Sequence, residues 1–261
     1  MSGAKVLLDI RNGAATITLN SAHNGNAIDL DLARDLMKTL QRCERESGIR
    51  AILIRGDGRM FCVGGDLVAI QDKAAGAPAY VRALLEFLHE AILSIARIPV
   101  PVVAAVHGAA AGAGLALACA CDLAVASKSS RFVMAYTRVG LTPDGSSSWY
   151  LPRLIGERRA LELALLNREL SAEEALAWGI VNEIVADDQL QDHAGHLLER
   201  LAAGATAAFG DAKKLLRTSL ANDLPAQLAR EADTICRALE RREAEIGLSA
   251  FRTKTAPKFR S

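Results

Sequence analysis

The stretch VHGAAAGAGLALACACDLAVA, residues 106–126, decides the fold, because it admits three different structures. It is apolar enough to suggest a membrane span, and its glycines suggest a phosphate loop. However, glycines at 108, 112 and 114 and prolines at 99 and 101 interrupt a helix where a span must be continuous. We therefore predict a buried strand over 101–106, a glycine turn, and a buried helix that starts near Gly112.

The turn itself does not match the known phosphate loops. In GAGLAL, Leu117 stands where a dinucleotide fingerprint needs its third glycine, and no Gly-Lys-Ser/Thr follows. What remains is a helix that starts with small residues, so its free backbone N–H groups can approach an anion or a developing oxyanion. Tight packing of a small-residue helix on a sheet explains the stretch equally well. The stretch alone leaves both interpretations open.

Charge and cysteine content limit the possible partners and the compartment. Among 261 residues, 31 Lys and Arg balance 30 Asp and Glu, so no charge excess attracts nucleic acid or an anionic membrane. The 5 cysteines form no CxxC pair and are odd in number, which is typical of reduced thiols. MSGAKVLLDI lacks the pattern of a secretion signal. We expect a cytoplasmic protein with neither a nucleic-acid nor a membrane partner.

Short strands alternate with helices over the first two-thirds of the chain, which predicts an α/β fold with a parallel or mixed sheet. Residues 5–20 read as two strands around Asn12-Gly13. Helices are expected over about 30–45 and 79–96, and after Val185 only helices, over about 189–202, 207–220 and 225–247. We expect residues 1–200 to form the core and residues 201–261 a C-terminal helical region.

Six stretches in register resemble the crotonase superfamily, also called the enoyl-CoA hydratase/isomerase family, over nearly the whole chain. They are NAIDLDLARDL (26–36), FCVGGDL (61–67), PVPVVAAVHGAAAGAGLALACACDLAVAS (99–127), RVGLTPDGSSSWYLPRLIG (138–156), LSAEEALAWGIVNEIV (170–185) and GLSAFRTKTAPKF (247–259). The resemblance implies a spiral of ββα turns and a C-terminal helical region used in trimerisation. A homotrimer or homohexamer is therefore expected.

The resemblance also implies how an acyl-CoA thioester is bound. The backbone N–H groups of Gly65 and Ala113 would form the oxyanion hole for the thioester oxygen. Coenzyme A would enter as part of the substrate, so no separate cofactor and no metal is expected. The family pattern places Lys254 near the phosphates, acting across a subunit boundary; a solvated tail lysine is the alternative. The full set of expected CoA contacts is Asn24, Gly25, Ala27, Asp66, Leu67, Phe251 and Lys254.

The acid and base groups decide which reaction follows. Hydratases of the family use two glutamates, but the matching positions here are Ala116 and Tyr136, which we expect in the acyl pocket. Double-bond isomerases of the family use one carboxylate at the position of Asp144, and a helix N-terminus there would favour its ionised form. From local sequence alone, Pro-Asp-Gly is a turn whose aspartate caps a short helix.

A branch of the family that dehalogenates 4-chlorobenzoyl-CoA uses an aspartate and a histidine that match Asp144 and His89. His89 is a candidate catalytic residue on that basis, whereas its position on a helix also fits a partly buried histidine with one hydrogen bond. We rank enoyl-CoA isomerisation first, and hydration or hydrolysis through Asp144 second. Aryl-CoA dehalogenation ranks third, and a non-catalytic acyl-CoA-binding protein last.

Overall fold

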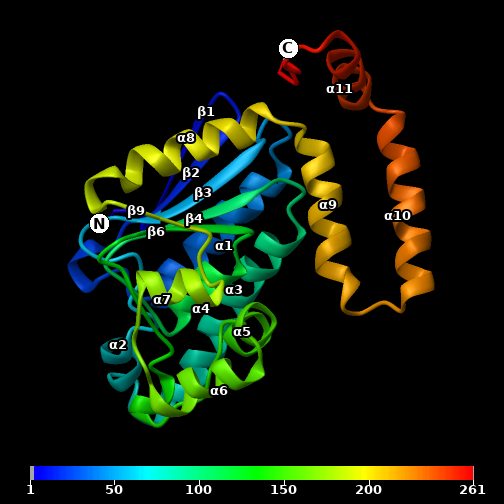
Figure 1. Cartoon of the computed structure of the whole chain (residues 1–261). Helices are drawn as coiled ribbons and strands as arrows, with labels where there is room; N and C mark the ends of the chain where they lie inside the picture. The colour runs from blue at the N-terminus through cyan, green and yellow to red at the C-terminus, as the bar shows by residue number, and fades with distance from the viewer. Residues whose placement is uncertain (1–2, 261) are drawn as a thin grey trace.

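The computed structural model describes residues 3–260, which form a twisted sheet with helices on both faces and a helical arm at the C-terminus (Figure 1). The main sheet has the strand order β1-β2-β3-β4-β6-β9. Within this sheet, only the β1–β2 pair is antiparallel. The strands are β1 (Val6–Arg11), β2 (Ala14–Leu19), β3 (Ala51–Gly56), β4 (Val102–Val106), β6 (Leu123–Ser127) and β9 (Glu183–Val185).

The sheet begins with the predicted hairpin. Asn12 and Gly13 have φ of 51° and 75°, and this pair of left-handed residues matches the twist of two antiparallel strands. The next four strands, β3, β4, β6 and β9, run parallel because each connection between them crosses over through at least one helix. The mixed α/β fold expected from the sequence is therefore confirmed.

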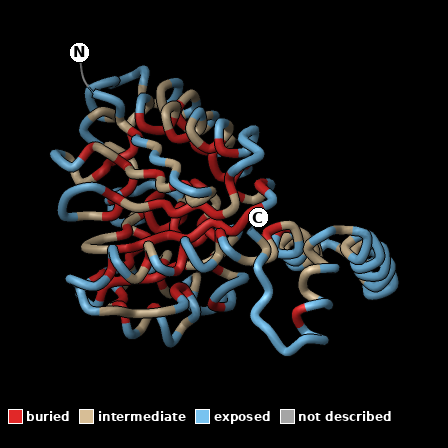
Figure 2. The backbone as a smooth tube through the Cα atoms, turned by 90° about the horizontal axis from the view of Figure 1, so that it is seen from above, coloured by how far each residue is buried: buried red, intermediate tan, exposed pale blue. Residues whose placement is uncertain are grey.

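Different helices cover the two faces of the sheet. α1 (Leu30–Arg45) and α3 (Ala77–Arg97) pack on one face, where they build the larger part of the core. α8 (Leu190–Ala203) covers the other face through Leu190, Leu197 and Leu198. Figure 2 shows that the buried chain is concentrated between these layers. The helices predicted over 30–45, 79–96 and 189–202 are thus confirmed within two residues of each end.

The opening stretch folds as a strand, a turn and a helix. β4 is followed by the short strand β5 (Ala109–Ala111) and by α4 (Ala113–Ala120), whose eight residues are all buried. No helix within residues 3–260 combines the length and the apolar character needed to cross a membrane. β5 belongs to a second sheet with β7 (Arg131–Val133) and β8 (Leu170–Ser171). The remaining helices of the core are α2 (Leu67–Gln71), α5 (Ser147–Ile155), α6 (Glu157–Leu166) and α7 (Ala172–Trp178).

The C-terminal arm contains three helices, α9 (Thr206–Ser219), α10 (Leu224–Leu239) and α11 (Arg242–Thr253). The single helix expected over 225–247 is therefore wrong, because the chain bends between α10 and α11. At the bend Arg241 is extended, with φ −91° and ψ 149°. Beyond it, the carboxylate of Glu243 accepts hydrogen bonds of 3.2 to 3.3 Å from the N–H groups of Ala207 and Ala208, which start α9. This tertiary contact replaces the continuation of α10.

Candidate active site

Two loops that follow β3 and β4 lie side by side at the site. The N–H of Cys62 donates to the carbonyl of Ala109 (3.1 Å), and the N–H of Ala111 donates to the carbonyl of Cys62 (3.0 Å). Glycine is required at 114, where an added Cβ would lie 2.1 Å from the carbonyl oxygen of Cys62. This close packing also brings Gly64, next to Gly65, beside Ala113, since a Cβ added at Gly64 would lie 3.5 Å from the Ala113 nitrogen.

The two predicted oxyanion donors are free. Among residues 3–260, neither the N–H of Gly65 nor that of Ala113 donates a hydrogen bond to another group of the chain. Ala113 is the first residue of α4, so its N–H has no partner within the helix and lies at the positive end of the helix dipole. Two free backbone donors beside each other can bind an oxygen that gains negative charge during a reaction.

The loop that carries Asp144 crosses the first turn of α4. A Cβ added at Gly145 would lie 3.8 Å from the Cβ of Ala113 and 3.4 Å from the Cβ of Ala116. Ala116 is fully buried, and its small side chain leaves room for this loop. The structure therefore brings three of the predicted site positions, Ala113, Ala116 and the neighbourhood of Asp144, into one cluster.

Asp144 is bound by Tyr136, a contact that the sequence did not predict. The Tyr136 hydroxyl donates a hydrogen bond of 2.6 Å to Oδ1 of Asp144 and lies 3.3 Å from the Asp144 carbonyl oxygen. α5 begins after Ser146, and no N–H of α5 donates to the Asp144 carboxylate within the described chain. The helix-capping interpretation of Asp144 is therefore wrong, and its side chain is available for another role.

Burial controls the ionisation of this pair. Removal from water raises the pKa of Asp144 above its usual value, while the hydrogen bond from Tyr136 and the charge of His89 lower it in part. The sequence suggested that a helix N-terminus would favour the ionised form, but burial is the largest influence and the pKa of Asp144 is raised overall. Burial also raises the pKa of Tyr136, and the negative charge of Asp144 raises it further. Tyr136 therefore remains a protonated donor.

His89 lies on α3, and its side chain is exposed. Within residues 3–260 it makes no hydrogen bond, so the interpretation of a partly buried histidine with one hydrogen bond is wrong. It lies close enough to Asp144 for its charge to act on the pKa of that carboxyl. A catalytic role for His89 stays a prediction.

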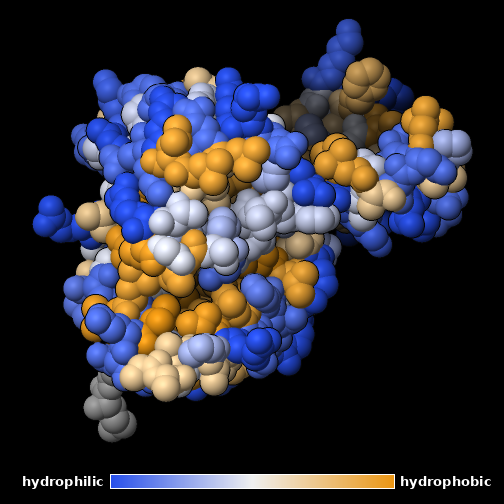
Figure 3. Space-filling model, turned by 90° about the horizontal axis from the view of Figure 1, so that it is seen from below, coloured by the Kyte–Doolittle hydropathy of each residue, from blue (hydrophilic) through white to orange (hydrophobic). Residues whose placement is uncertain are grey.

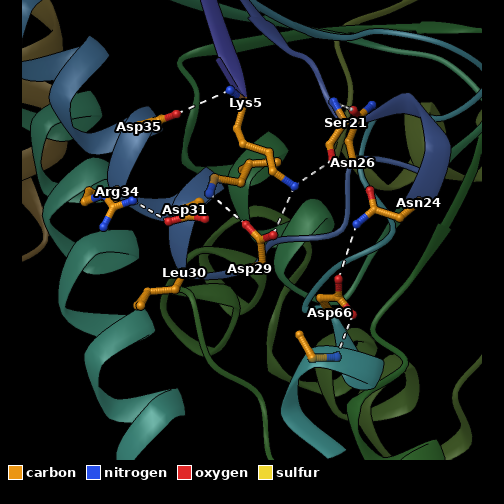
Figure 4. A network of polar contacts seen from close by, with 12 residues as sticks. Lys5, Ser21, Asn24, Asn26, Asp29, Leu30, Asp31, Arg34, Asp35 and Asp66 are labelled. Atoms are coloured by element: carbon orange, nitrogen blue, oxygen red, sulfur yellow. Dashed lines mark hydrogen bonds and ion pairs between the residues drawn. The ribbon is translucent and has the colours of Figure 1, made fainter. Parts of the chain in front are cut away.

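Four of the residues expected to contact CoA lie together. Asn24 donates a hydrogen bond of 3.3 Å to Oδ2 of Asp66 (Figure 4), and the N–H of Val63 donates to the carbonyl of Gly25 (3.1 Å). Asp66 also caps α2 by accepting from the N–H of Ala69 (2.9 Å), which leaves Leu67 46 % exposed at the start of that helix. Ala27, the next member of the set, is buried behind them.

Phe251 and Lys254 are not brought to this cluster. Both are exposed at the end of α11, on the arm, whereas α2 lies at the opposite side of the core (Figure 1). One chain therefore holds the expected CoA contacts in two separate groups.

Metal-ligating residues are not clustered in the described part of the chain. Among residues 3–260 no three His, Cys, Asp or Glu side chains lie close enough to hold one ion. His193 instead pairs with Glu183, with 2.6 Å between Nε2 and Oε2.

An α/β core of this topology, with one free N–H group at the start of buried α4 and a second in the adjacent loop after β3, matches the crotonase fold. The chain belongs to the enoyl-CoA hydratase/isomerase family, because the family model of that description matches residues 9–261. It is similar over 97% of its length to the 1,2-epoxyphenylacetyl-CoA isomerase of Escherichia coli K12, with 37% identity over 255 residues and 97% of the relative covered.

Two further comparisons extend this similarity. A "Probable enoyl-CoA hydratase" of Rhodobacter capsulatus is 39% identical over 259 residues, which are 99% of each chain. The crystal structure of an enoyl-CoA hydratase from Polaromonas superposes with a TM-score of 0.93 at 35% identity, covering 98% of this chain and 99% of the other. The crotonase fold expected from the sequence motifs is thus confirmed. The relatives from Escherichia coli and Rhodobacter capsulatus, however, carry the names of different reactions, an isomerisation and a hydration.

Proposed function

We propose that the protein is an enoyl-CoA double-bond isomerase in which Asp144 is the acid and base. The observation that carries the proposal is the Asp144 carboxylate itself, half-buried beside the first turn of α4 with a raised pKa. A carboxylate with a raised pKa is a stronger base, and its acid form can return the proton. The similarity to an isomerase of epoxyphenylacetyl-CoA supports this choice.

Isomerisation moves one proton from one carbon of the substrate to another and consumes no second reactant. The thioester oxygen would accept hydrogen bonds from the N–H groups of Gly65 and Ala113. Asp144 would then remove a proton from the α or γ carbon, and the electron pair would spread over the dienolate, whose oxygen carries the negative charge. The resulting carboxylic acid would return the proton to the other carbon, so that the double bond moves and the mass does not change. Backbone donors of this kind typically contribute a factor of about a hundred or more in rate.

The direct test is a panel of 2-enoyl-, 3-enoyl- and aryl-CoA thioesters incubated with the protein and separated by chromatography with mass detection. The expected product has an unchanged mass and a shifted retention time, and it gains deuterium in heavy water. Asp144→Asn should abolish both changes, whereas Asp223→Asn, at the exposed cap of α10, should not. Binding of acyl-CoA without turnover of any thioester would overturn the proposal in favour of a non-catalytic protein.

Hydration through Asp144 is the second candidate, and the similarity to the Rhodobacter protein favours it. The same buried carboxylate would then activate water instead of removing a carbon-bound proton. Incubation in ¹⁸O-water separates the two reactions, since hydration gives a product heavier by one labelled water. Such a product from 2-enoyl thioesters, with no migrated double bond, would overturn isomerisation.

The arm supports a proposal about assembly. α10 has no buried residue, and Leu228, Ile235 and Leu239 are exposed on it. Figure 3 shows hydrophobic side chains on these projecting helices. We propose that the arm packs against other copies of the chain in a homotrimer or homohexamer. Light scattering should then give three or six times the chain mass of 27.7 kDa, and a monomer would contradict this.

A further inference from the structure

Tyr136 lies between the turn that presents the Ala113 N–H group and the carboxylate of Asp144. A Cβ added at Gly112, in the turn that precedes Ala113, would lie 3.7 Å from Cζ of Tyr136. The hydroxyl on that carbon is 2.6 Å from Oδ1 of Asp144. The tip of the phenol thus touches both the turn that presents the oxyanion donor and the carboxylate that would move the proton.

The local backbone is built to place this side chain. Ala135, directly before Tyr136, has a left-handed φ of 59°, which is unfavourable for alanine by about 1–2 kcal/mol. On the other side, the Tyr136 carbonyl accepts a hydrogen bond of 3.0 Å from the N–H of Leu141 and closes the turn. Non-glycine residues in this conformation persist only where the surrounding structure holds them. The chain therefore bends sharply at the point where the phenol enters the site.

We propose that Tyr136 is a positioning residue, whose hydroxyl holds Oδ1 of Asp144 so that Oδ2 stays free for proton transfer. Within the described residues no other side chain donates to that carboxylate. An unheld aspartate would rotate about its side-chain bonds, and the geometry of proton transfer tolerates little displacement. The inference rests on the proposed function of Asp144 and adds the residue that orients it.

The sign of the electrostatic effect follows from the same contact. A hydrogen bond donated to a carboxylate favours its charged form, so its loss raises the pKa of Asp144 above the value that burial already sets. Besides Tyr136, the titratable group that acts on the pKa of Asp144 is His89 on α3. His89 does not replace the phenol as a donor, because its exposed side chain makes no hydrogen bond to Asp144 within the described residues.

The test is Tyr136→Phe, which keeps the ring beside Gly112 and removes only the hydroxyl. We expect the acidic limb of the pH profile of kcat to move up by about one pH unit, which is a tenfold loss of kcat on that limb, with KM unchanged. Tyr150→Phe is the matched control, since its hydroxyl is bound 2.5 Å from Arg217 instead of to Asp144. Tyr150→Phe should leave the acidic limb of the pH profile of kcat unchanged.

A second readout needs no substrate. In protein labelled with ¹³C at aspartate carboxyls, the Asp144 resonance is assigned by its loss in Asp144→Asn, and its titration midpoint should rise in Tyr136→Phe. If this midpoint and the kinetic limb both stay at their wild-type values, the positioning role is wrong. If the midpoint rises but the wild-type protein moves no double bond, the contact stands and the proposed function fails.

Discussion

Nζ of Lys213 on α9 lies 2.7 Å from Oδ2 of Asp122, the residue directly before β6, and this ion pair joins the C-terminal arm to the core. The Lys213 side chain is only 8% exposed, and its ammonium also donates to the carbonyls of Ile95 (2.7 Å) and Val100 (3.2 Å). Arg217, one turn further along α9, lies 2.7 Å from Oδ1 of the same aspartate. A single carboxylate therefore neutralises two cations of the arm.

Asp122→Ala should destabilise the protein strongly, because it leaves the buried ammonium of Lys213 without a counter-ion. Breaking a buried ion pair from one side typically costs about 3–5 kcal/mol. Unfolding in urea, followed by circular dichroism, measures the change. The control is Glu46→Ala, which removes the exposed pair with Arg42 and should cost at most about 1 kcal/mol. If Asp122→Ala and Glu46→Ala lowered the free energy of unfolding equally, Asp122 would not be what holds the arm to the core.

Gly64→Ala should disable the oxyanion hole without removing any functional side chain. The added Cβ would lie 2.8 Å from the carbonyl oxygen of Ala111 at a φ of 98°, so the loop must shift and carry the N–H of Gly65 away from that of Ala113. We expect kcat for the thioester substrate to fall by about a hundredfold or more.

Gly156→Ala serves as the control for Gly64→Ala. It places the same methyl group at a φ of 81° but with no atom within 4 Å. It should therefore lower stability without affecting kcat. Unchanged kcat in Gly64→Ala would mean that this loop does not present the oxyanion donor.

Local chemistry was enough to predict much of the core. Asn12-Gly13 is a turn sequence that needs no tertiary contact to be recognised, and the periodic apolar positions of α1 show its buried face directly. The same holds for the glycine turn at 112, since only backbone geometry is involved. These elements are set by residues close to one another in the chain.

Other features depend on residues that meet only in the folded chain. The bend at Arg241 is held by Glu243 of α11, which accepts from the N–H of Ala207 at the start of α9. The two residues are 36 positions apart, so the helical periodicity of 225–247 did not reveal the contact. The pairing of Tyr136 with Asp144 has no sequence pattern either. A tyrosine in an otherwise apolar stretch carries one polar group that needs a partner, and this was the only signal available.

His89→Gln should have little effect on isomerisation if His89 acts only through its charge. A general acid or base typically contributes about a hundredfold or more, whereas the exposed His89 side chain lacks a hydrogen bond to Asp144. We therefore expect His89→Gln to lower kcat/KM by less than about tenfold, which is well below the contribution of a general acid or base. A loss of a hundredfold in steady-state kinetics, with KM retained, would instead place His89 in contact with the reacting groups.

Lys254→Ala should raise the KM for acyl-CoA through the site of a neighbouring copy, because Lys254 lies on the arm and Asp144 in the core. Mixing the Lys254→Ala and Asp144→Asn chains then creates sites with both wild-type residues, so activity should return at low substrate concentration. Lys258→Ala, in the exposed tail, is the control and should bind acyl-CoA normally. No recovery in mixed oligomers would argue that Lys254 is a solvated tail residue.

Asp144→Asn should make the protein more stable at neutral pH while abolishing its activity. Burial raises the pKa of Asp144, so folding favours its protonated form, and the stabilisation from this group is present at low pH and lost as the pH rises through the folded-state value. Asparagine has nearly the same shape, can still accept from the Tyr136 hydroxyl, and carries no charge to bury. The gain in the free energy of unfolding should therefore be largest at pH 7 and shrink as the pH falls below the pKa of the wild-type carboxyl. Urea titrations across this range measure it, and a variant less stable than the wild type at pH 7 would show that the ionised carboxylate contributes to the fold rather than straining it for catalysis.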